Sequence, residues 1–180
     1  MRFLYLILAA LGASTGTAWA QAPKARDAQS TLILELKTGK VTIRLRPDLA
    51  PKHVERVKLL AKEKFYDGLK FHRVIAGFMA QTGDPTGTGS GGSKYPDLPA
   101  EFSKEPFTRG TIGAARTDDP NSANSQFFIA FGDTSHLNGK YTVWGQVTEG
   151  MEHVDRIKKG EAGSGRVDNP DIVVKAYLAP

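Results

Sequence analysis

The chain has 180 residues, a length typical of one domain with a sizeable buried core. It is 40% hydrophobic and 24% charged, and its formal net charge is +5 with lysine and glutamate interspersed, a balance that argues against nucleic-acid binding. It contains no cysteine, which excludes disulfides, thiolate catalysis and cysteine-ligated zinc.

The first twenty residues have the pattern of a cleavable secretory signal peptide. Arg2 gives a short positive start, residues 3–11 form an apolar run too short to span a bilayer, and Ala18-Trp19-Ala20 forms a small-x-small cleavage site. An uncleaved membrane anchor is the alternative. Cleavage would remove Arg2 and leave a formal charge of +4. We expect export without stable membrane insertion, with the periplasm favoured over secretion, and a flexible leader over residues 21–30.

Residues 31–180 are expected to form one domain that begins with a hairpin and a helix. Residues 31–37 and 41–45 alternate on either side of a Thr38-Gly39 turn, which predicts two paired strands. Pro51 suits the first position of a helix, and apolar residues then recur at helical spacing to about Lys64.

Beyond Gly68 the pattern is mostly that of short strands. Strands are predicted over residues 69–74, 78–82, 111–115, 126–131, 141–147 and 172–178. Met151, Val154 and Ile157 predict a second short helix. Several short strands with two helices and long loops favour a mainly β barrel capped by helices, with no internal repeat and no second domain.

Two segments carry the functional information. Residues 71–84 read FHRVIAGFMAQTGD, and residues 125–129 read SQFFI. They combine an arginine, glutamines and several large apolar side chains, with no evident nucleophile or metal-ligand set. This inventory suits binding a proline and twisting the amide bond before it. Both segments, in this order and at this separation, resemble the signature of cyclophilin-type peptidyl-prolyl cis-trans isomerases, and the resemblance runs from about Leu32 to Leu178.

The resemblance implies a fold, an activity and a catalytic residue. The fold would be a closed eight-stranded antiparallel β-barrel capped by two α-helices, one at each end. The activity would be isomerisation of X-Pro bonds in proline-containing polypeptides, with no cofactor and no metal. Arg73 occupies the position of the family's catalytic arginine; judged alone, it would be read as an arginine in a salt bridge at a barrel rim.

The resemblance also implies a proline pocket formed by Phe78, Met79, Phe128 and Leu137. Compact apolar walls of aromatic and thioether groups would bury and orient a pyrrolidine ring. Alternate residues of a strand face opposite sides, so we assign Phe127 and Ile129 to the barrel core and Phe128 to the site.

Polar residues complete the predicted substrate site. Gln81 and Gln126 lie two residues from Met79 and Phe128, on the same strand faces, and Gln81 could orient Arg73; surface amides are the alternative for both. Ala115 and Arg116 resemble the strand that offers main-chain groups to the residues before proline, in the manner of strand-edge recognition. His72 is predicted to be structural and to point away from Arg73.

Besides Thr82, which replaces a frequent Gly, the sequence departs from the family at two site positions. His136 stands where members that bind cyclosporin tightly have Trp, and Tyr141 stands where a His is common. Neither change removes the arginine or the apolar pocket, so activity is expected and cyclosporin binding is predicted to be weak. The glycine-rich residues 83–93 lack the lysine and helix of a phosphate-binding loop and predict a mobile loop beside the groove.

Two other functions are alternatives to the isomerase. A peptide-binding module or chaperone with incidental isomerase activity would use the same pocket, and the sequence does not separate the two. A hydrolase is disfavoured because no nucleophile elbow or HExxH motif is present, and the four histidines lack ligand spacing. A monomer is expected.

Overall fold

The computed structural model describes residues 30–180. The predicted signal peptide, and all but the last residue of the predicted leader, lie outside the described residues. Within these residues the structure has two α-helices, α1 (Pro51–Lys62) and α2 (Met151–Asp155), and the short 3₁₀ helix η2 (Ser135–Leu137). The strands are β1 (Thr31–Leu36), β2 (Gly39–Leu45), β3 (Arg73–Ile75), β4 (Met79–Thr82), β5 (Thr111–Ala114), β6 (Phe127–Ala130), β7 (Val143–Glu149) and β8 (Val173–Leu178).

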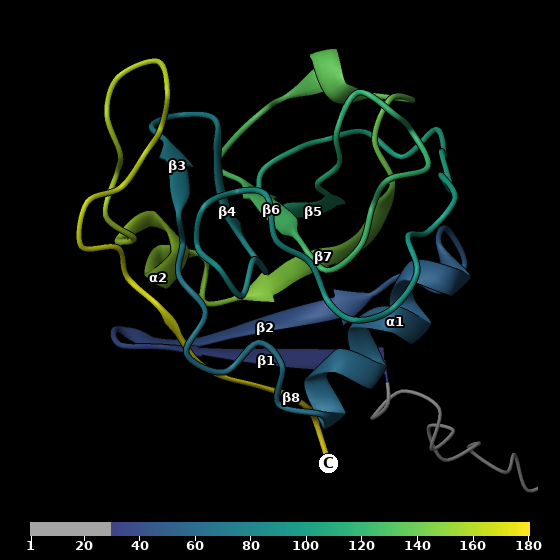
Figure 1. Ribbon diagram of the computed structural model, residues 1–180, viewed down its shortest axis with the longest axis horizontal. Helices are drawn as coiled ribbons and strands as arrows, with labels where there is room; N and C mark the ends of the chain where they lie inside the picture. The colour runs from purple at the N-terminus through teal and green to yellow at the C-terminus, as the bar shows by residue number, and fades with distance from the viewer. Residues whose placement is uncertain (1–29) are drawn as a thin grey trace, which may run out of the picture.

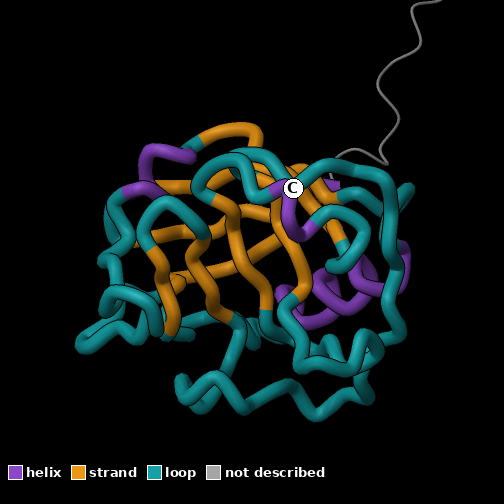
Figure 2. The backbone as a smooth tube through the Cα atoms, turned by 90° about the horizontal axis from the view of Figure 1, so that it is seen from above, coloured by secondary structure: helices purple, strands orange, loops and turns teal. Residues whose placement is uncertain are grey.

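All eight strands belong to one antiparallel sheet in the order β3-β4-β6-β5-β7-β2-β1-β8. The strands cross the middle of the molecule and long loops run around them (Figure 2). Within the described residues, β3 and β8 at the two ends of the sheet share no ladder. The backbone just before β3 is joined to the start of β8 by an isolated bridge between Lys70 and Ile172 and by hydrogen bonds such as that from the Val173 N–H to the Leu69 carbonyl at 2.8 Å. The eight antiparallel strands and two helices are as expected. The sheet curls into a half barrel, however, and its expected full closure is not confirmed.

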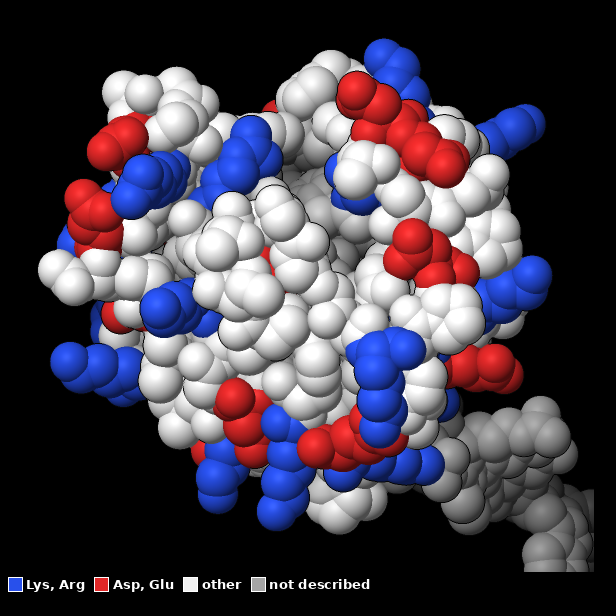
Figure 3. Space-filling view, in the orientation of Figure 1, with Lys and Arg blue, Asp and Glu red and all other residues white. Residues whose placement is uncertain are grey.

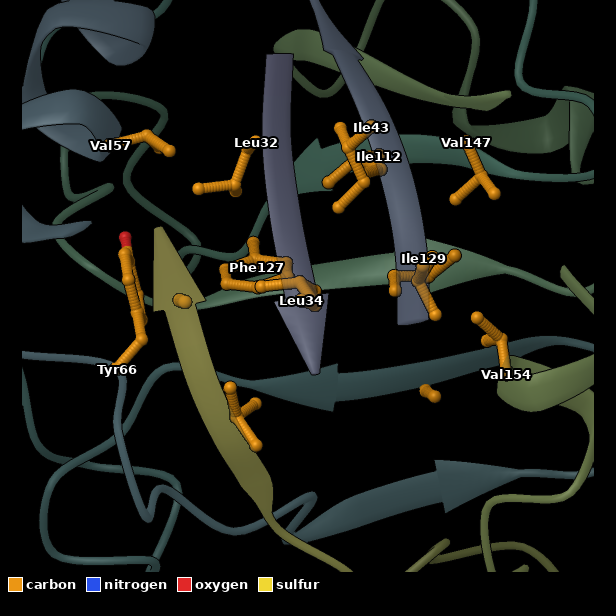
Figure 4. Packing of buried hydrophobic residues seen from close by; sticks show 14 of the residues in the cluster. Leu32, Leu34, Ile43, Val57, Tyr66, Ile112, Phe127, Ile129, Val147 and Val154 are labelled. Carbon is orange, nitrogen blue, oxygen red and sulfur yellow. The ribbon is translucent and has the colours of Figure 1, made fainter. Parts of the chain in front are cut away.

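The two helices lie at opposite ends of the sheet (Figure 1). Val57 of α1 and Val154 of α2 enter the buried core from these two ends (Figure 4). At the start of α1, Pro51 occupies the first turn, and the Glu101 carboxylate accepts hydrogen bonds from the backbone N–H groups of residues 52 and 53. The helix is two residues shorter than predicted, because Lys64 adopts a left-handed φ of 58° that ends it.

The predicted hairpin of β1 and β2 is confirmed, with Leu36 opposite Gly39 at its turn. Along β1, buried and half-buried residues alternate, so Leu32 and Leu34 face the core. The centre of the core is aromatic. The Phe127 ring meets Tyr66 and Trp144 edge to face, with centroids 5.5 and 5.2 Å away.

Phe127 and Ile129 belong to this main core, as the alternation predicted (Figure 4). Phe128 belongs instead to a second, smaller cluster of buried apolar side chains on the other face of the sheet, which we call the outer cluster: Met79, Phe107, Phe128, Leu137 and Val143. The alternation in β6 therefore separates residues that stabilise the barrel from residues that form an outward surface.

One strand prediction was partly wrong. The pattern predicted a strand over residues 69–74, but β3 begins only at Arg73. The preceding backbone instead bonds to the segment before β8: the N–H of Phe71 donates to the carbonyl of Asp171 at 2.9 Å. Leu69 is half-buried and Phe71 is fully buried, so apolar residues alternate here as in a strand although no continuous ladder forms. The other strands lie within two residues of their predicted ends, and α2 stops at Asp155 rather than Ile157.

Charged side chains of both signs are interspersed over the face shown in Figure 3, without a block of one sign. This agrees with the mixed charge pattern of the sequence. None of the helices within residues 30–180 is long and apolar enough to cross a membrane.

Candidate active site

The candidate site is a row of residues that runs across four neighbouring strands on the outer face of the sheet. Arg73 of β3 pairs with Gln81 of β4, Gln81 with Phe128 of β6, and Phe128 with Gly113 of β5. Directly opposed residues in antiparallel strands point to the same face. Strand register therefore places the arginine, the amide and the aromatic ring side by side, although 55 residues separate Arg73 from Phe128.

Gly113 shapes the apolar part of the row. A Cβ atom at this position would lie 2.4 Å from Cζ of Phe128 and 2.8 Å from Cε1 of Phe107. The missing side chain allows the Phe128 ring to fold over β5 and stack on Phe107, with ring centroids 5.7 Å apart. The glycine thus fixes the floor of the outer cluster.

A groove of about 680 Å³ opens above this floor. Nine of the predicted site residues line it: Arg73, Phe78, Met79, Gln81, Ala115, Arg116, Phe128, Leu137 and Tyr141. Met79, Phe128 and Leu137 are almost fully buried. An apolar hollow with a cationic group at its margin can bind a compact apolar ring and place a donor beside it.

The guanidinium of Arg73 is held by a directional chain of hydrogen bonds. Its Nη1 donates to Oε1 of Gln81 at 3.2 Å, and Nε2 of Gln81 donates to Oε1 of Gln126 at 2.9 Å. Nε2 of Gln126 then donates to the carbonyls of Gly89 and Gly91 at 3.0 and 2.8 Å. An arginine offers no acceptor, so it fixes the orientation of both amides. Neither glutamine is the surface amide of the alternative interpretation.

Gln126 differs from the other predicted residues because it lines a neighbouring hollow of about 470 Å³ rather than the main groove. Its amide hydrogens are occupied by the glycine-rich loop, so it connects that loop to Gln81. His136 also lies off the groove lining. Its ring packs against Phe78 at the rim, with centroids 5.3 Å apart.

A buried carboxylate holds the glycine-rich loop beside the groove. Oδ1 of Asp84 accepts from the N–H and the hydroxyl of Thr86 at 2.7 and 2.8 Å, and Oδ2 accepts from the N–H of Gly89 at 2.6 Å. Burial alone would raise the pKa of Asp84. The hydrogen bonds from Thr86, Gly89 and Gly91 outweigh burial and lower the pKa to about 2. The loop is therefore tied to β4 and, through Gln126, to β6.

Ala115 and Arg116 form the side of the groove beyond β5. The N–H of Ala115 donates to the carbonyl of Gln126 at 2.9 Å. Among residues 30–180, the carbonyl of Ala115 and the N–H of Arg116 have no hydrogen-bond partner. The Arg116 guanidinium lies 4.4 Å from the centre of the Tyr141 ring and donates to the carbonyl of Lys140 at 2.9 Å. The Arg116 side chain is thus bound to other parts of the protein. The carbonyl of Ala115 and the N–H of Arg116 are left available to a peptide in the groove.

The sequence did not identify the contribution of the loop before β8. The carbonyl of Ser164 accepts a hydrogen bond from Nε of Arg73 at 3.2 Å. The loop reaches β3 because Gly165 has a φ of +73° and no Cβ, which would lie 2.5 Å from Cγ1 of Ile75. The run Gly163-Ser164-Gly165 was the available signal, a second glycine-rich segment that the sequence reasoning left unused. Phe107 was missed because no motif marks it.

His72 lies in the groove wall below the glycine-rich loop. It is buried, and its ring nitrogens have no hydrogen-bond partner within the described residues. Burial lowers the pKa of His72, so its imidazole is neutral near pH 7. Within residues 30–180, no three His, Cys, Asp or Glu side chains gather closely enough to hold a metal ion.

The fold and the groove together define a class of proteins, antiparallel β half barrels with a peptide-sized groove on the outer face. The comparisons with known proteins specify the family. Residues 31–178 match the family model described as cyclophilin type peptidyl-prolyl cis-trans isomerase/CLD. A solved cyclophilin from Hirschia baltica is 28% identical, with a TM-score of 0.75 over 84% of this chain and 74% of that one. A Cryptosporidium parvum cyclophilin solved in the presence of the dipeptide Ala-Pro is 26% identical, with a TM-score of 0.76 over 83% of this chain and 99% of that one.

Relatives with similar sequences indicate the same family. A probable peptidyl-prolyl cis-trans isomerase of Brucella suis is 58% identical over 170 residues, covering 88% of this chain and 87% of that protein. A peptidyl-prolyl cis-trans isomerase of Helicobacter pylori is 39% identical over 155 residues, covering 83% and 94%. The chain therefore belongs to the cyclophilin-type peptidyl-prolyl cis-trans isomerases, enzymes that isomerise X-Pro bonds.

The role of Gly113 can be tested by adding one methyl group. Gly113→Ala should push the Phe128 ring out of its stack on Phe107 and lower kcat/KM for an X-Pro peptide by roughly ten- to a hundredfold, because the floor of the groove is displaced. Gly132→Ala is the matched control, since nothing lies within 4 Å of a Cβ there. Equal kcat/KM values for the two variants, measured by exchange NMR, would contradict this role.

The lowered pKa of Asp84 predicts a contribution to acid stability. A carboxyl whose pKa is lower in the folded state stabilises the protein above its unfolded pKa, near 3.9, and loses that contribution as the pH falls toward about 2. Between pH 5 and about 2.5, the free energy of unfolding of the wild type should therefore fall more steeply than that of Asp84→Asn. Urea titrations at each pH measure this difference. Identical slopes for the wild type and Asp84→Asn would refute the prediction.

Proposed function

We propose that this enzyme isomerises X-Pro bonds by non-covalent stabilisation of the twisted amide through Arg73. The barrier to rotation about a peptide bond is about 18–20 kcal/mol and arises from amide resonance. Twisting the C–N bond returns a lone pair to the proline nitrogen. A fixed cationic donor beside that nitrogen interacts more strongly with the twisted amide than with either planar form, and this difference lowers the barrier.

The hydrogen bonds around Arg73 support this role. Gln81 and the Ser164 carbonyl each accept one N–H of the guanidinium, on Nη1 and Nε. A guanidinium has five N–H groups, so donors remain for a substrate in the groove. Because the planar guanidinium is held at two points, it needs little reorientation when the X-Pro amide of the substrate twists.

Substrate binding would use the apolar and main-chain parts of the groove. Met79, Phe128 and Leu137 would surround the proline ring, with Phe78 at the rim. The carbonyl of Ala115 and the N–H of Arg116 would pair with the backbone before the proline, as a strand edge binds an extended peptide. Gln81 would hydrogen-bond the substrate as well as orient Arg73, and Gln126 would support both through the loop.

The observation that carries the proposal is the cross-strand row of Arg73, Gln81 and Phe128, which brings the cation and the apolar pocket to one groove. Arg73→Ala should lower kcat/KM on the order of a hundredfold or more with an unchanged circular-dichroism spectrum. Exchange NMR on a short X-Pro peptide provides the rates. The exposed Arg44→Ala serves as the control and should retain wild-type rates. Wild-type turnover by Arg73→Ala would disprove the mechanism.

The biological role proposed is assistance to the folding of exported proteins. It rests on the signal-peptide pattern of residues 1–20, and it implies unfolded or partly folded proline-containing polypeptides as partners of a monomeric, periplasmic enzyme. The alternative is a peptide-binding chaperone, which the same apolar groove would serve. A deletion strain complemented with Arg73→Ala separates the two, because full rescue by this variant would assign the role to binding rather than rotation.

Weak inhibition by cyclosporin follows from His136. Its ring covers Phe78 at the rim of the groove, and an imidazole does not offer the indole N–H of the Trp found in tightly binding members at this position. We expect inhibition only well above nanomolar concentrations, with a gain in affinity for His136→Trp. Low-nanomolar inhibition of the wild type in a protease-coupled assay would overturn this expectation.

A further inference from the structure

Two hollows flank the main groove on different sides. The hollow that Gln126 lines shares four residues with the groove: Gln81, Gly89, Ala115 and Arg116. A second hollow of about 540 Å³ shares His72, Gly87 and Arg166 with the groove, and we call it the Arg166 hollow. The two hollows have no lining residue in common. An extended peptide in the groove therefore has a distinct recess available on each side.

The wall of the Arg166 hollow is fixed by backbone pairing. Arg166 forms an isolated bridge with Arg73, and the N–H of Val167 donates to the carbonyl of His72 at 3.3 Å. The bridge between Lys70 and Ile172 closes the other end of the segment. The hollow is therefore part of the folded frame next to the candidate catalytic arginine.

Hydrogen-bond donors without strong partners dominate this hollow. Within residues 30–180, the ammonium of Lys70 has no ion pair or hydrogen bond, and its stem runs past Gly87, where a Cβ would lie 3.1 Å from Cδ of Lys70. The nearest carboxylate to the Arg166 guanidinium is Asp168 at 4.0 Å, and both side chains are about three-quarters exposed, at 77% and 76%. The side-chain amide of Asn169 is likewise unpaired among the described residues.

The acidic groups nearby do not neutralise these donors. Asp168 is the single carboxylate among the lining residues of the hollow, and they also include the two cationic residues Lys70 and Arg166. Asp84, below the glycine-rich loop, is engaged by Thr86 and Gly89. The His72 imidazole is neutral near pH 7 and adds no charge. An excess of cationic and amide donors over acceptors suits a carboxylate.

The proposed function fixes which part of a substrate reaches this hollow. If the residues before the proline lie against Ala115 and Arg116, the chain after the proline leaves on the opposite side, past Arg166. We infer that the Arg166 hollow is a specificity subsite in which Lys70 and Arg166 bind an aspartate or glutamate side chain on the carboxyl side of the substrate proline. This inference rests on the proposed function and adds a substrate preference to it.

Paired peptides test the preference directly. Each pair is identical except for Glu or Gln at the first, second or third position after the proline, and a further pair carries Glu or Gln two residues before it. For the wild type, kcat/KM from exchange NMR should be about two- to fivefold higher with Glu at one of the positions after the proline, the range expected for exposed ion pairs. The preference should shrink in high salt.

Charge variants assign the effect to the hollow. Lys70→Gln and Arg166→Gln should each reduce the Glu-to-Gln ratio toward one, and Asp168→Asn should increase it because a competing carboxylate is removed. Lys175→Gln, on an exposed position of β8, is the matched control and should keep the wild-type ratio. Because each ratio compares two peptides on the same variant, a general loss of activity does not imitate the effect.

The outcomes separate this inference from the proposed function. Acceleration of both members of every pair with a ratio of one would overturn the subsite and leave the isomerase mechanism intact. Loss of all acceleration in Arg73→Ala, together with a Glu preference in the wild type, supports both. A Glu preference confined to the position before the proline, or one unchanged in Lys70→Gln and Arg166→Gln, would place the recognition elsewhere and overturn the inference.

Discussion

The site depends on the register between four antiparallel strands. Arg73, Gln81, Phe128 and Gly113 come from distant parts of the chain, but ladder pairing puts them in one line across the outer face. A slip of one residue in β4 or β6 would turn its site residue into the core and a core residue into the groove. The main apolar core fixes this register, because Ala80, Phe127 and Ile129 fit only on the inner face. The same strands therefore pack the core with their inner face and position the site residues on their outer face.

The polar part of the site extends this constraint to the loops. Gln81 and Gln126 sit on the strands and link the arginine to the carbonyls of Gly89 and Gly91. On the other side, the backbone of the loop before β8 supplies the Ser164 carbonyl. Two glycine-rich segments therefore help to hold one guanidinium. Residues 163–165 do so directly through the Ser164 carbonyl, and residues 83–93 do so indirectly through Gln126 and Gln81. Because Nε and Nη1 of Arg73 are both hydrogen-bonded, the guanidinium is held in one orientation, as a preorganised donor requires.

Much of this arrangement could be predicted from the sequence because it follows from local periodicity and a specific motif. Alternation correctly separated Phe128 from Phe127 and Ile129, and spacing placed Gln81 beside Met79 on one strand. The extent of β3 was not predictable, since the backbone of Leu69 and Phe71 bonds to a segment distant in sequence, near the start of β8, without forming a ladder. The Ser164 contact and the proximity of Lys70 and Arg166 in one hollow were missed for the same reason. Both features form where segments distant in the sequence come together, and local sequence patterns do not predict such contacts.

The separation of the main core from the outer cluster has a consequence for the history of such a protein. Side chains of the groove contact one another and the rim loops, while the burial that stabilises the barrel takes place across the sheet. Changes such as the histidine at position 136 can therefore accumulate at the rim of the groove with little effect on folding. A lineage can diversify the ligands that it accepts while it keeps the same scaffold and the same arginine.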